Sequence, residues 1–224
     1  MQIQADNILK IYGTGENKVT ALKSASMTIF EGDFISIMGP SGSGKSTLLH
    51  IISGLDNPTS GTVFYDNTDI HNGSDKVLSA FRRQKIGFIF QQFNLLPVLT
   101  ARENIIMPLL LDKKQPDELY LQELSSFLGL ENRLSHLPNK LSGGQQQRAA
   151  IARALIAKPD IIFADEPTGN LDSKSGNEVM QMLCNIRKKM NKTLVVITHD
   201  THIAEMADRR FTITDGELSE VNVQ

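Results

Sequence analysis

The sequence predicts an α/β domain with a mainly parallel central sheet, and two observations carry that prediction. Short runs rich in β-branched and aromatic residues alternate with segments of helical periodicity along the 224 residues. Each of these runs is followed at once by a polar segment, and in open α/β sheets ligands bind outside the carboxyl ends of the strands. The fold class therefore also predicts where a functional site should lie.

Four runs are predicted as strands, namely 34–38 (FISIM), 86–90 (IGFIF), 161–164 (IIFA) and 193–198 (TLVVIT). Two helices are predicted at 45–53, with Gly54 as a C-terminal cap, and at 173–190. The buried face of the second helix is predicted from its helical spacing as Val179, Met182, Leu183, Ile186 and Met190. From 91 to 158 the pattern is helical, interrupted by prolines and without a convincing strand, which predicts an inserted helical subdomain.

Composition excludes some classes of function. The net charge of −2 argues against a protein that binds nucleic acid by neutralising many phosphates. No stretch approaches the roughly 20 apolar residues that cross a bilayer, so we expect any membrane role to need a separate chain. The single cysteine, Cys184, excludes a disulfide within the chain, and the N-terminal segment lacks the pattern of a secretory signal. We therefore expect a protein of a reducing compartment.

A glycine-rich segment follows the first predicted strand. Residues 39–46 read GPSGSGKS and match G-x-x-x-x-G-K-[ST], between a strand and a helix, as in a phosphate-binding P-loop. Gly42 and Gly44 allow backbone N–H groups to wrap a phosphate, and the helix N-terminus adds positive potential. We expect Lys45 to reach the β- and γ-phosphates and Ser46 to hold Mg²⁺. The other expected nucleotide contacts of this segment are Gly39, Ser41, Ser43 and Thr47.

Two adjacent carboxylates follow the run 161–164. An acid at the end of a strand can hold the Mg²⁺ shell, so Asp165 is expected to be a metal ligand. Glu166 is then placed to polarise the attacking water as a general base. Such a pair alone is also typical of a solvated loop. Its combination with Lys45 predicts an enzyme that hydrolyses a nucleoside triphosphate.

A third motif narrows the class. Residues 141–145, LSGGQ, are called the signature segment below, and with the following QQRAAIARAL they resemble the signature motif and helix of ATP-binding-cassette (ABC) ATPases. The resemblance extends over essentially the whole chain. Ser142 offers a hydroxyl, and Gly143 and Gly144 leave backbone amides uncovered at a helix start, which describes a second phosphate site. On its residues alone, an ordinary helix cap is the simpler interpretation.

The resemblance implies the P-loop NTPase fold of ABC ATPases in a single domain, 1–224. Its core would be formed by 1–90 and 159–224, with an antiparallel β region at the N-terminal side, and the helical signature subdomain by 91–158. It also implies ATP and Mg²⁺ as cofactors and ATP hydrolysis as the reaction. A second copy of the chain is expected to sandwich the ATP head to tail, offering Ser142, Gly143, Gly144 and Gln145 to the nucleotide at the P-loop.

Four further residues match family positions one by one. Tyr12 resembles the aromatic residue that stacks on adenine, although core packing is an alternative for a strand aromatic. Gln91 resembles the Q-loop glutamine beside Mg²⁺ and water; the adjacent Gln92 makes the register ambiguous, and FNLLP at 93–97 favours Gln91. Asp172 resembles the D-loop acid at the dimer seam, and His199 the H-loop histidine that contacts the γ-phosphate. The expected catalytic set is thus Lys45, Gln91, Glu166 and His199, and the metal set is Ser46, Gln91 and Asp165.

Three segments indicate a branch of the family. They are the insertion GTGENKV after Tyr12, FNLLP after the glutamines, and GNLD at 169–172. Together they resemble the branch of macrolide exporters, lipoprotein-release ATPases and antimicrobial-peptide-resistance transporters. The resemblance implies a separate integral membrane transporter subunit as partner, no nucleic acid, and a location at the cytoplasmic face of a bacterial-type cell membrane.

Other members of the superfamily are expected to have different sequence features. A cell-division ATPase coupled to an extracytoplasmic regulator belongs to the same branch and stays open. A DNA-repair ATPase is expected to carry a long coiled coil between P-loop and signature, and 91–141 is short and broken by prolines. A translation factor of the cassette type is expected to carry paired cassettes, whereas the P-loop pattern occurs once.

Overall fold

The computed structural model describes residues 1–221, and the chain divides into two compact units. The first unit contains Met1–Ser79 together with the segment that starts at Thr193, and the second contains Ala80–Lys192. Helix α2 (Asp75–Lys85) continues the chain from the first unit into the second. Within residues 1–221, no helix has both the length and the apolar character needed to span a membrane.

An antiparallel sheet forms the N-terminal part of the first unit, in the strand order β2-β1-β4-β5. Its strands are β1 (Ile3–Tyr12), β2 (Val19–Ile29), β4 (Ser60–Tyr65) and β5 (Thr68–Asp69), with short 3₁₀ turns at Gly15–Asn17 and Ile70–Asn72. Ile3, Ala5 and Ile8 of β1 are buried, as expected for a strand with one face toward the core. This confirms the antiparallel β region predicted at the N-terminal side.

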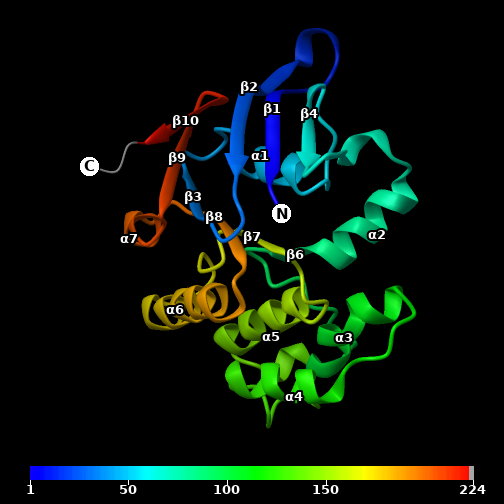
Figure 1. The fold of residues 1–224 in the computed structure, drawn as a ribbon. Helices are drawn as coiled ribbons and strands as arrows, with labels where there is room; N and C mark the ends of the chain where they lie inside the picture. Colours follow the sequence, from blue (N-terminus) through cyan, green and yellow to red (C-terminus); the bar gives the residue numbers. More distant parts are fainter. Residues whose placement is uncertain (222–224) are drawn as a thin grey trace. The chain divides into compact units, whose positions relative to one another are not determined.

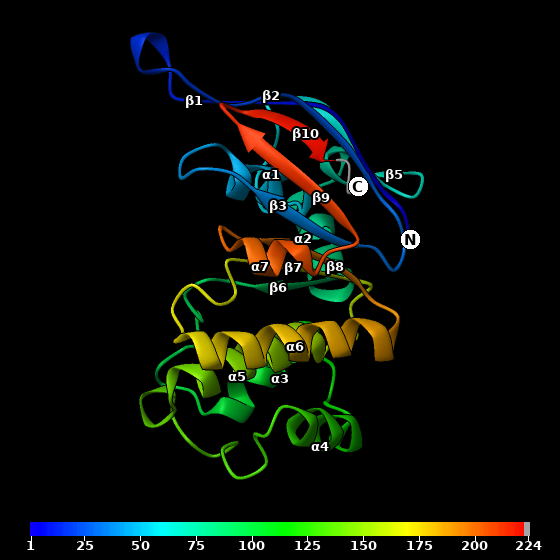
Figure 2. The same cartoon turned by 90° about the vertical axis from the view of Figure 1, so that its left-hand side faces the viewer.

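The second set of strands in this unit is mainly parallel. Strand β3 (Phe34–Met38) pairs in parallel with β8 (Thr193–Ile197) and β9 (Arg209–Thr214), and β10 (Glu217–Val221) adds antiparallel to β9. Helices α1 (Lys45–Ile52) and α7 (Thr201–Glu205) follow β3 and β8 (Figures 1 and 2). Since Ile37 pairs with Ile197, the carboxyl ends of β3 and β8 meet at one edge. The loop 39–46 and His199 both follow that edge.

The second unit joins a parallel strand pair to a group of helices. Its elements are β6 (Ile86–Ile89), β7 (Ile161–Asp165), α3 (Ala101–Leu111), α4 (Glu118–Phe127), a 3₁₀ turn at Pro138–Lys140, α5 (Gly143–Leu155) and α6 (Ser173–Met190). Helix α5 contacts α3 on one side and α6 on the other (Figures 1 and 2). Ile89 pairs with Ala164, so the segments after β6 and β7 also start at one edge.

The elements agree closely with those predicted. Strand β3 and helix α6 have the predicted bounds, and β6, β7, β8 and α1 differ from them by one residue at one end. Gly54, just beyond α1, has the positive φ of 70° predicted for a C-terminal cap. Between 91 and 158 the described structure holds helices and no strand. The boundaries of an inserted subdomain at 91 and 158 stay a prediction.

Two predictions were wrong in detail. On α6, Met182 and Met190 are only partly buried, while Met180 is buried beside Val179, Leu183 and Ile186, because the buried face starts at Gly176. Gly176 packs closely against Thr168, since a Cβ built on this glycine would lie 3.3 Å from the Thr168 side chain. Pro108 does not interrupt the helical pattern, since it lies inside α3.

Candidate functional site

The loop 39–46 starts where β3 ends, and Gly42 and Gly44 in it have positive φ. Gly44 is the N-cap of α1 with φ 108°, and a Cβ at this residue would lie 2.3 Å from the carbonyl oxygen of Ala21 on β2. Gly42 has φ 78°, and a Cβ built on it would meet no atom within 4 Å. The loop therefore packs tightly against β2 at Gly44 and has open space at Gly42.

Two buried polar groups of this loop suit an anion. The Lys45 side chain is buried, and its ammonium donates to the carbonyl oxygens of Gly39 at 2.9 Å and Pro40 at 2.8 Å. Ser43 is also buried, and its hydroxyl has no hydrogen-bond partner among the described residues. In the described part of the chain, this buried cation is thus held by neutral carbonyls next to an unsatisfied buried hydroxyl, and both groups would gain from a phosphate.

The start of α1 adds backbone donors. Its N-cap, Gly44, has no side chain that could accept from the first-turn amides. The amides of Lys45, Ser46 and Thr47 are therefore the orphan donors of this helix, and together with the helix dipole they favour an anion. The Ser46 side chain is exposed, as a Mg²⁺ ligand must be before the metal binds.

His199 lies at the same edge of the first unit. It follows β8 by two residues, and β8 is the parallel neighbour of β3. The adjacent Asp200 caps α7 by accepting a hydrogen bond from the amide of His202 at 2.8 Å. Because Asp200 supplies this cap, the exposed ring of His199 is not needed to start α7.

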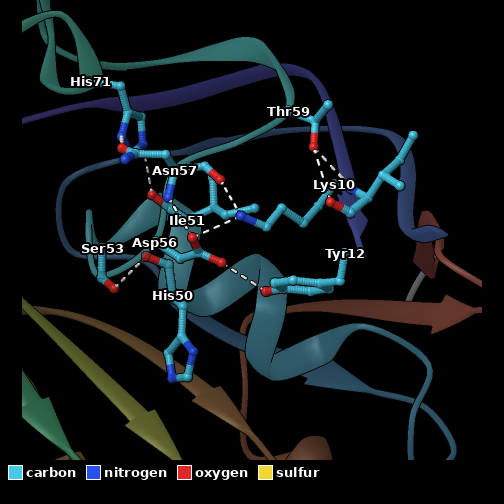
Figure 3. Close-up of polar contacts among 10 residues, drawn as sticks. Lys10, Tyr12, His50, Ile51, Ser53, Asp56, Asn57, Thr59 and His71 are labelled. Carbon is cyan, nitrogen blue, oxygen red and sulfur yellow. Dashed lines mark hydrogen bonds and ion pairs between the residues drawn. The ribbon is translucent and has the colours of Figure 1, made fainter. Parts of the chain in front are cut away.

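Tyr12 ends β1 and is 42% exposed, which excludes the alternative of core packing. Its hydroxyl donates to Oδ2 of Asp56 at 2.7 Å, and Lys10 donates to Oδ1 of Asp56 at 2.7 Å (Figure 3). Burial and the hydrogen bond to Asp56 raise the pKa of Tyr12, against the opposing effect of the Thr47 hydroxyl. The unit thus presents an exposed aromatic ring whose hydroxyl is fixed.

Gln91 and Glu166 come together in the second unit. Gln91 follows β6, and Glu166 follows Asp165, the last residue of β7. A Cβ built on Gly169 would lie 2.8 Å from Nε2 of Gln91 and 3.3 Å from Oε2 of Glu166. Both side chains therefore lie against the same glycine, an amide beside a carboxylate.

The turn that carries Glu166 is held from two directions. Glu166 has φ 45°, and its carbonyl accepts from the amide of Gly169 at 3.0 Å. Gln147, fully buried on α5, donates to the carbonyl of Pro167 at 2.6 Å, and Asn170 donates to the carbonyl of Gln91 at 2.9 Å. Gln147 and Asn170 lie in the segments QQRAAIARAL and GNLD, but neither was expected to support this turn, because the hydrogen-bond partner of each lies far away in the sequence.

The signature segment forms an ordinary helix cap in this chain. The amide of Gln145 donates to the Ser142 hydroxyl at 3.3 Å, and the Ser142 amide donates to Oε1 of Gln145 at 3.0 Å, which is a capping box. Gly143 and Gly144 occupy the first two helical positions, where amides have no partner within the helix. The helix cap is therefore present, and the binding of a phosphate by the amides of Gly143 and Gly144 stays a prediction.

Asp172 lies close to the signature segment at the start of α6. A Cβ built on Gly144 would be 3.6 Å from the hydroxyl oxygen of Ser175, and Ser175 donates to Asp172 from its amide at 3.0 Å and its hydroxyl at 2.7 Å. These hydrogen bonds lower the pKa of Asp172. The carboxylate is exposed and stays charged as the cap of α6.

The donor chemistry also suits Mg²⁺. Residues 1–221 contain no group of three or more His, Cys, Asp or Glu that could hold a metal alone. Mg²⁺ is typically bound by one or two protein oxygens together with substrate phosphates and water. A serine hydroxyl at 46 and a carboxylate at 165 are donors of that kind.

Comparison with known proteins decides the family. The sequence model of the family described as ABC transporter matches residues 22–169, which include the loop 39–46, Gln91, the signature segment and Glu166. The chain belongs to the ABC transporter family. It is an ATP-binding and ATP-hydrolysing subunit, and the fold is that of the ABC ATPases, as predicted.

Relatives of this ABC ATPase cover almost the whole chain. The uncharacterized ABC transporter ATP-binding protein MJ1508 of Methanocaldococcus jannaschii is 49% identical over 98% of this chain and 98% of that protein. The lipoprotein-releasing system ATP-binding protein LolD of Cytophaga hutchinsonii is 46% identical over 96% of this chain and 98% of its own length. A solved dimeric post-hydrolysis state of the ATP-binding cassette MJ0796 with ADP and Pi matches with a TM-score of 0.89 and 45% identity, covering 99% of this chain and all of that one.

Proposed function

We propose that this ABC ATPase holds the phosphates of ATP at the loop 39–46 and hydrolyses the γ-phosphate with Glu166 as general base. The observation that carries the proposal is the buried ammonium of Lys45, whose hydrogen-bond partners among residues 1–221 are the carbonyls of Gly39 and Pro40. A phosphate gives this cation an anionic partner, and a charge-assisted hydrogen bond is roughly twice as strong as a neutral one.

The other residues have distinct roles in this proposal. Bound Mg-ATP supplies the γ-phosphoryl group and a divalent cation. Ser46 and Asp165 hold the Mg²⁺ shell, Gln91 adjoins it, and Glu166 takes the proton of the attacking water. His199 orients the γ-phosphate side, while Tyr12 stacks on the adenine. The remaining phosphate and nucleotide contacts are Gly39, Ser41, Gly42, Ser43, Gly44 and Thr47.

A second copy of the chain completes the site. We propose that Ser142, Gly143, Gly144 and Gln145 of that copy face the nucleotide, with Asp172 at the seam between the copies. The two glycine amides are the donors that the capping box does not use, and a helix start attracts anions. The dimeric state of the related cassette MJ0796 with ADP and Pi supports this arrangement. ATP then drives closure of the dimer, and hydrolysis opens it.

The transport role proposed for this cycle is the release or export of lipid-anchored or amphiphilic substrates. LolD proteins of two organisms, at 46% and 44% identity, are described as parts of lipoprotein-releasing systems, and the segments GTGENKV, FNLLP and GNLD indicate the same branch. The chain would act at the cytoplasmic face of the membrane through a separate membrane-spanning subunit. Lipoprotein release is the specific version of this role that we put to a test.

The test purifies the tagged chain from its native membrane in mild detergent, identifies the membrane-spanning subunit and reconstitutes the complex in proteoliposomes. Addition of a triacylated lipoprotein is expected to raise ATP hydrolysis, whereas the same protein without its acyl chains, the matched control, leaves it unchanged. Equal responses to both proteins would exclude lipoprotein release and favour an export or regulatory role. Purification without any membrane protein would reject the transport role itself.

A further inference from the structure

The segment directly after α1 is tied closely to the end of β1. The amides of Leu55 and Asp56 both donate to the carbonyl of His50, at 2.7 and 3.1 Å, and this closes the C-terminus of the helix. Asp56 therefore has a fixed backbone at one end of α1, while the loop 39–46 lies at the other end. Its side chain points toward Lys10 and Tyr12 of β1 (Figure 3).

Asp56 binds two residues of β1 at once. One carboxylate oxygen accepts from Lys10 and the other from the Tyr12 hydroxyl, each at 2.7 Å. Lys10 makes a further hydrogen bond to the carbonyl of Asn57 at 2.6 Å, and its ammonium lies 4.7 Å from the centroid of the Tyr12 ring. Lys10 thus lies over the Tyr12 ring as well as beside its hydroxyl partner Asp56.

The Asp56–Asn57 segment is itself braced from the side away from Tyr12. The ring nitrogens of His71 lie 2.9 Å from Oδ1 of Asn57 and 3.0 Å from the carbonyl of Ile51 (Figure 3). Thr59 binds β1 as well, because its hydroxyl accepts from the amide of Ile11 at 2.9 Å. The Asp56–Asn57 segment is therefore held in place, and the hydrogen bond to Asp56 fixes the position of the Tyr12 hydroxyl.

We infer that Asp56 and Lys10 are positioning residues for nucleobase recognition, which lock the Tyr12 ring in the orientation that receives the base of ATP. The inference rests on the proposed stacking role of Tyr12. An exposed tyrosine at a strand end would otherwise lose rotamer freedom each time a base binds, and fixing it beforehand removes that cost from binding. The ionised carboxylate suits this role, because burial alone would raise the pKa of Asp56, and the hydrogen bonds from Lys10 and Tyr12 lower it instead.

The test is a double-mutant cycle on the full-length protein, read out as KM and kcat of ATP hydrolysis. Asp56→Ala is expected to raise KM for ATP about three- to tenfold with kcat within about twofold, the size of one ordinary hydrogen bond. Tyr12→Phe keeps the ring and removes the hydroxyl, so adding Asp56→Ala to it is expected to change KM little further. Asp56→Asn keeps an acceptor and is expected to recover part of the loss.

A matched control separates this effect from a general loss of charge. Glu220→Gln removes another carboxylate that is bound by a cation, Arg209 at 2.7 Å on strands β9 and β10, and is expected to leave KM unchanged. Lys10→Met is expected to raise KM in the same direction as Asp56→Ala. The midpoint of thermal unfolding of each variant identifies any that fail to fold.

The outcomes distinguish the inference from the proposal beneath it. Unchanged KM in Asp56→Ala and Asp56→Asn, with a raised KM in Tyr12→Ala, would overturn the positioning role and leave the stacking role intact. An equal effect of Asp56→Ala with and without the Tyr12 hydroxyl would also overturn it. Unchanged KM in Tyr12→Ala would instead remove Tyr12 from the nucleotide site.

Discussion

Two helices of this chain start with a glycine-rich segment, and they start in different ways. Helix α1 has Gly44 as its N-cap, in the left-handed region and without any side-chain cap. Helix α5 has Ser142 as its N-cap, and Ser142 and Gln145 satisfy each other's amides in a capping box. The first-turn amides of α1 therefore stay available to a ligand. At the start of α5 the capping box satisfies the amides of Ser142 and Gln145, and the amides of Gly143 and Gly144 take no part in it.

The difference extends to charge. Beside the start of α1, Lys45 is buried, and the Ser43 hydroxyl has no partner among the described residues. The start of α5 has no basic residue in the signature segment, and Ser142 is exposed. We propose that the loop 39–46 binds phosphate by itself, and that the signature segment adds to a phosphate already bound by another copy. Four substitutions test this division.

The largest effect is expected from Glu166→Gln, which leaves both helix starts intact. Removal of the general base should slow hydrolysis about 100- to 10,000-fold while ATP binding persists. Phosphate release and equilibrium ATP binding measure the two properties on one sample. Glu178→Gln, an exposed carboxylate on α6, is the matched control and should hydrolyse at the original rate. A Glu166→Gln protein with undiminished turnover would remove Glu166 from this role.

Lys45→Ala tests whether the start of α1 binds ATP alone. Loss of a charged hydrogen-bond donor is expected to weaken ATP binding about 10- to 150-fold, measured by calorimetry in dilute protein of the Glu166→Gln background. Lys23→Ala on β2, which breaks only a 3.7 Å ion pair with Glu217, should bind ATP normally. Normal ATP affinity of the Lys45 variant would contradict the division.

Ser142→Ala tests the start of α5. We expect the ATP affinity of dilute protein to change less than about twofold and hydrolysis at high protein concentration to fall about tenfold, as for one lost hydrogen bond to a charged group. The control is Thr100→Ala, which destroys the equivalent capping box on α3 and should cost similar stability. Equal activity losses in the two variants would mean that Ser142 only caps a helix.

The smallest effect is expected from Gln145→Ala, which removes one arm of the capping box on α5. The free energy of unfolding should fall by about 0.5–1 kcal/mol, measured by urea denaturation. Glu103→Ala removes the corresponding arm on α3 and should give a fall of the same order. A much larger fall for Gln145→Ala alone would show that the signature segment has a structural role beyond its cap.

The strands of the parallel type could be predicted because each is a continuous buried run. Strand β3 is an example, with Phe34, Ile35 and Ile37 fully buried. Strands β1 and β2 were expected only as an antiparallel region, because their pairing has register shifts after Ala5 and Ile8 that disturb the alternation of polar and apolar residues. The hairpin of β9 and β10 was not predicted, although the dipeptide Asp215-Gly216 is typical of a hairpin turn. In the structure both residues have the positive φ that such a turn needs.

The site shows the same limit at the level of single residues. Lys45, Glu166 and Ser142 belong to local motifs, where the spacing alone implies the chemistry. Asp56 does not, because its partner Tyr12 is 44 residues away, and only the folded chain brings the hydroxyl to the carboxylate. Gln147 likewise acts on a turn 20 residues further along the chain. Partners of this kind depend on tertiary packing, which no local pattern encodes.

In the proposed dimer the phosphate held by one copy meets the signature segment of another, and the mass of the Glu166→Gln protein with ATP tests this most directly. Light scattering is predicted to give twice the chain mass of 24.8 kDa with Mg-ATP, and the single chain mass with ADP or when Ser142→Arg is added. A protein that stays at the single chain mass with saturating ATP, or a dimer that forms regardless of Ser142→Arg, would contradict the shared site.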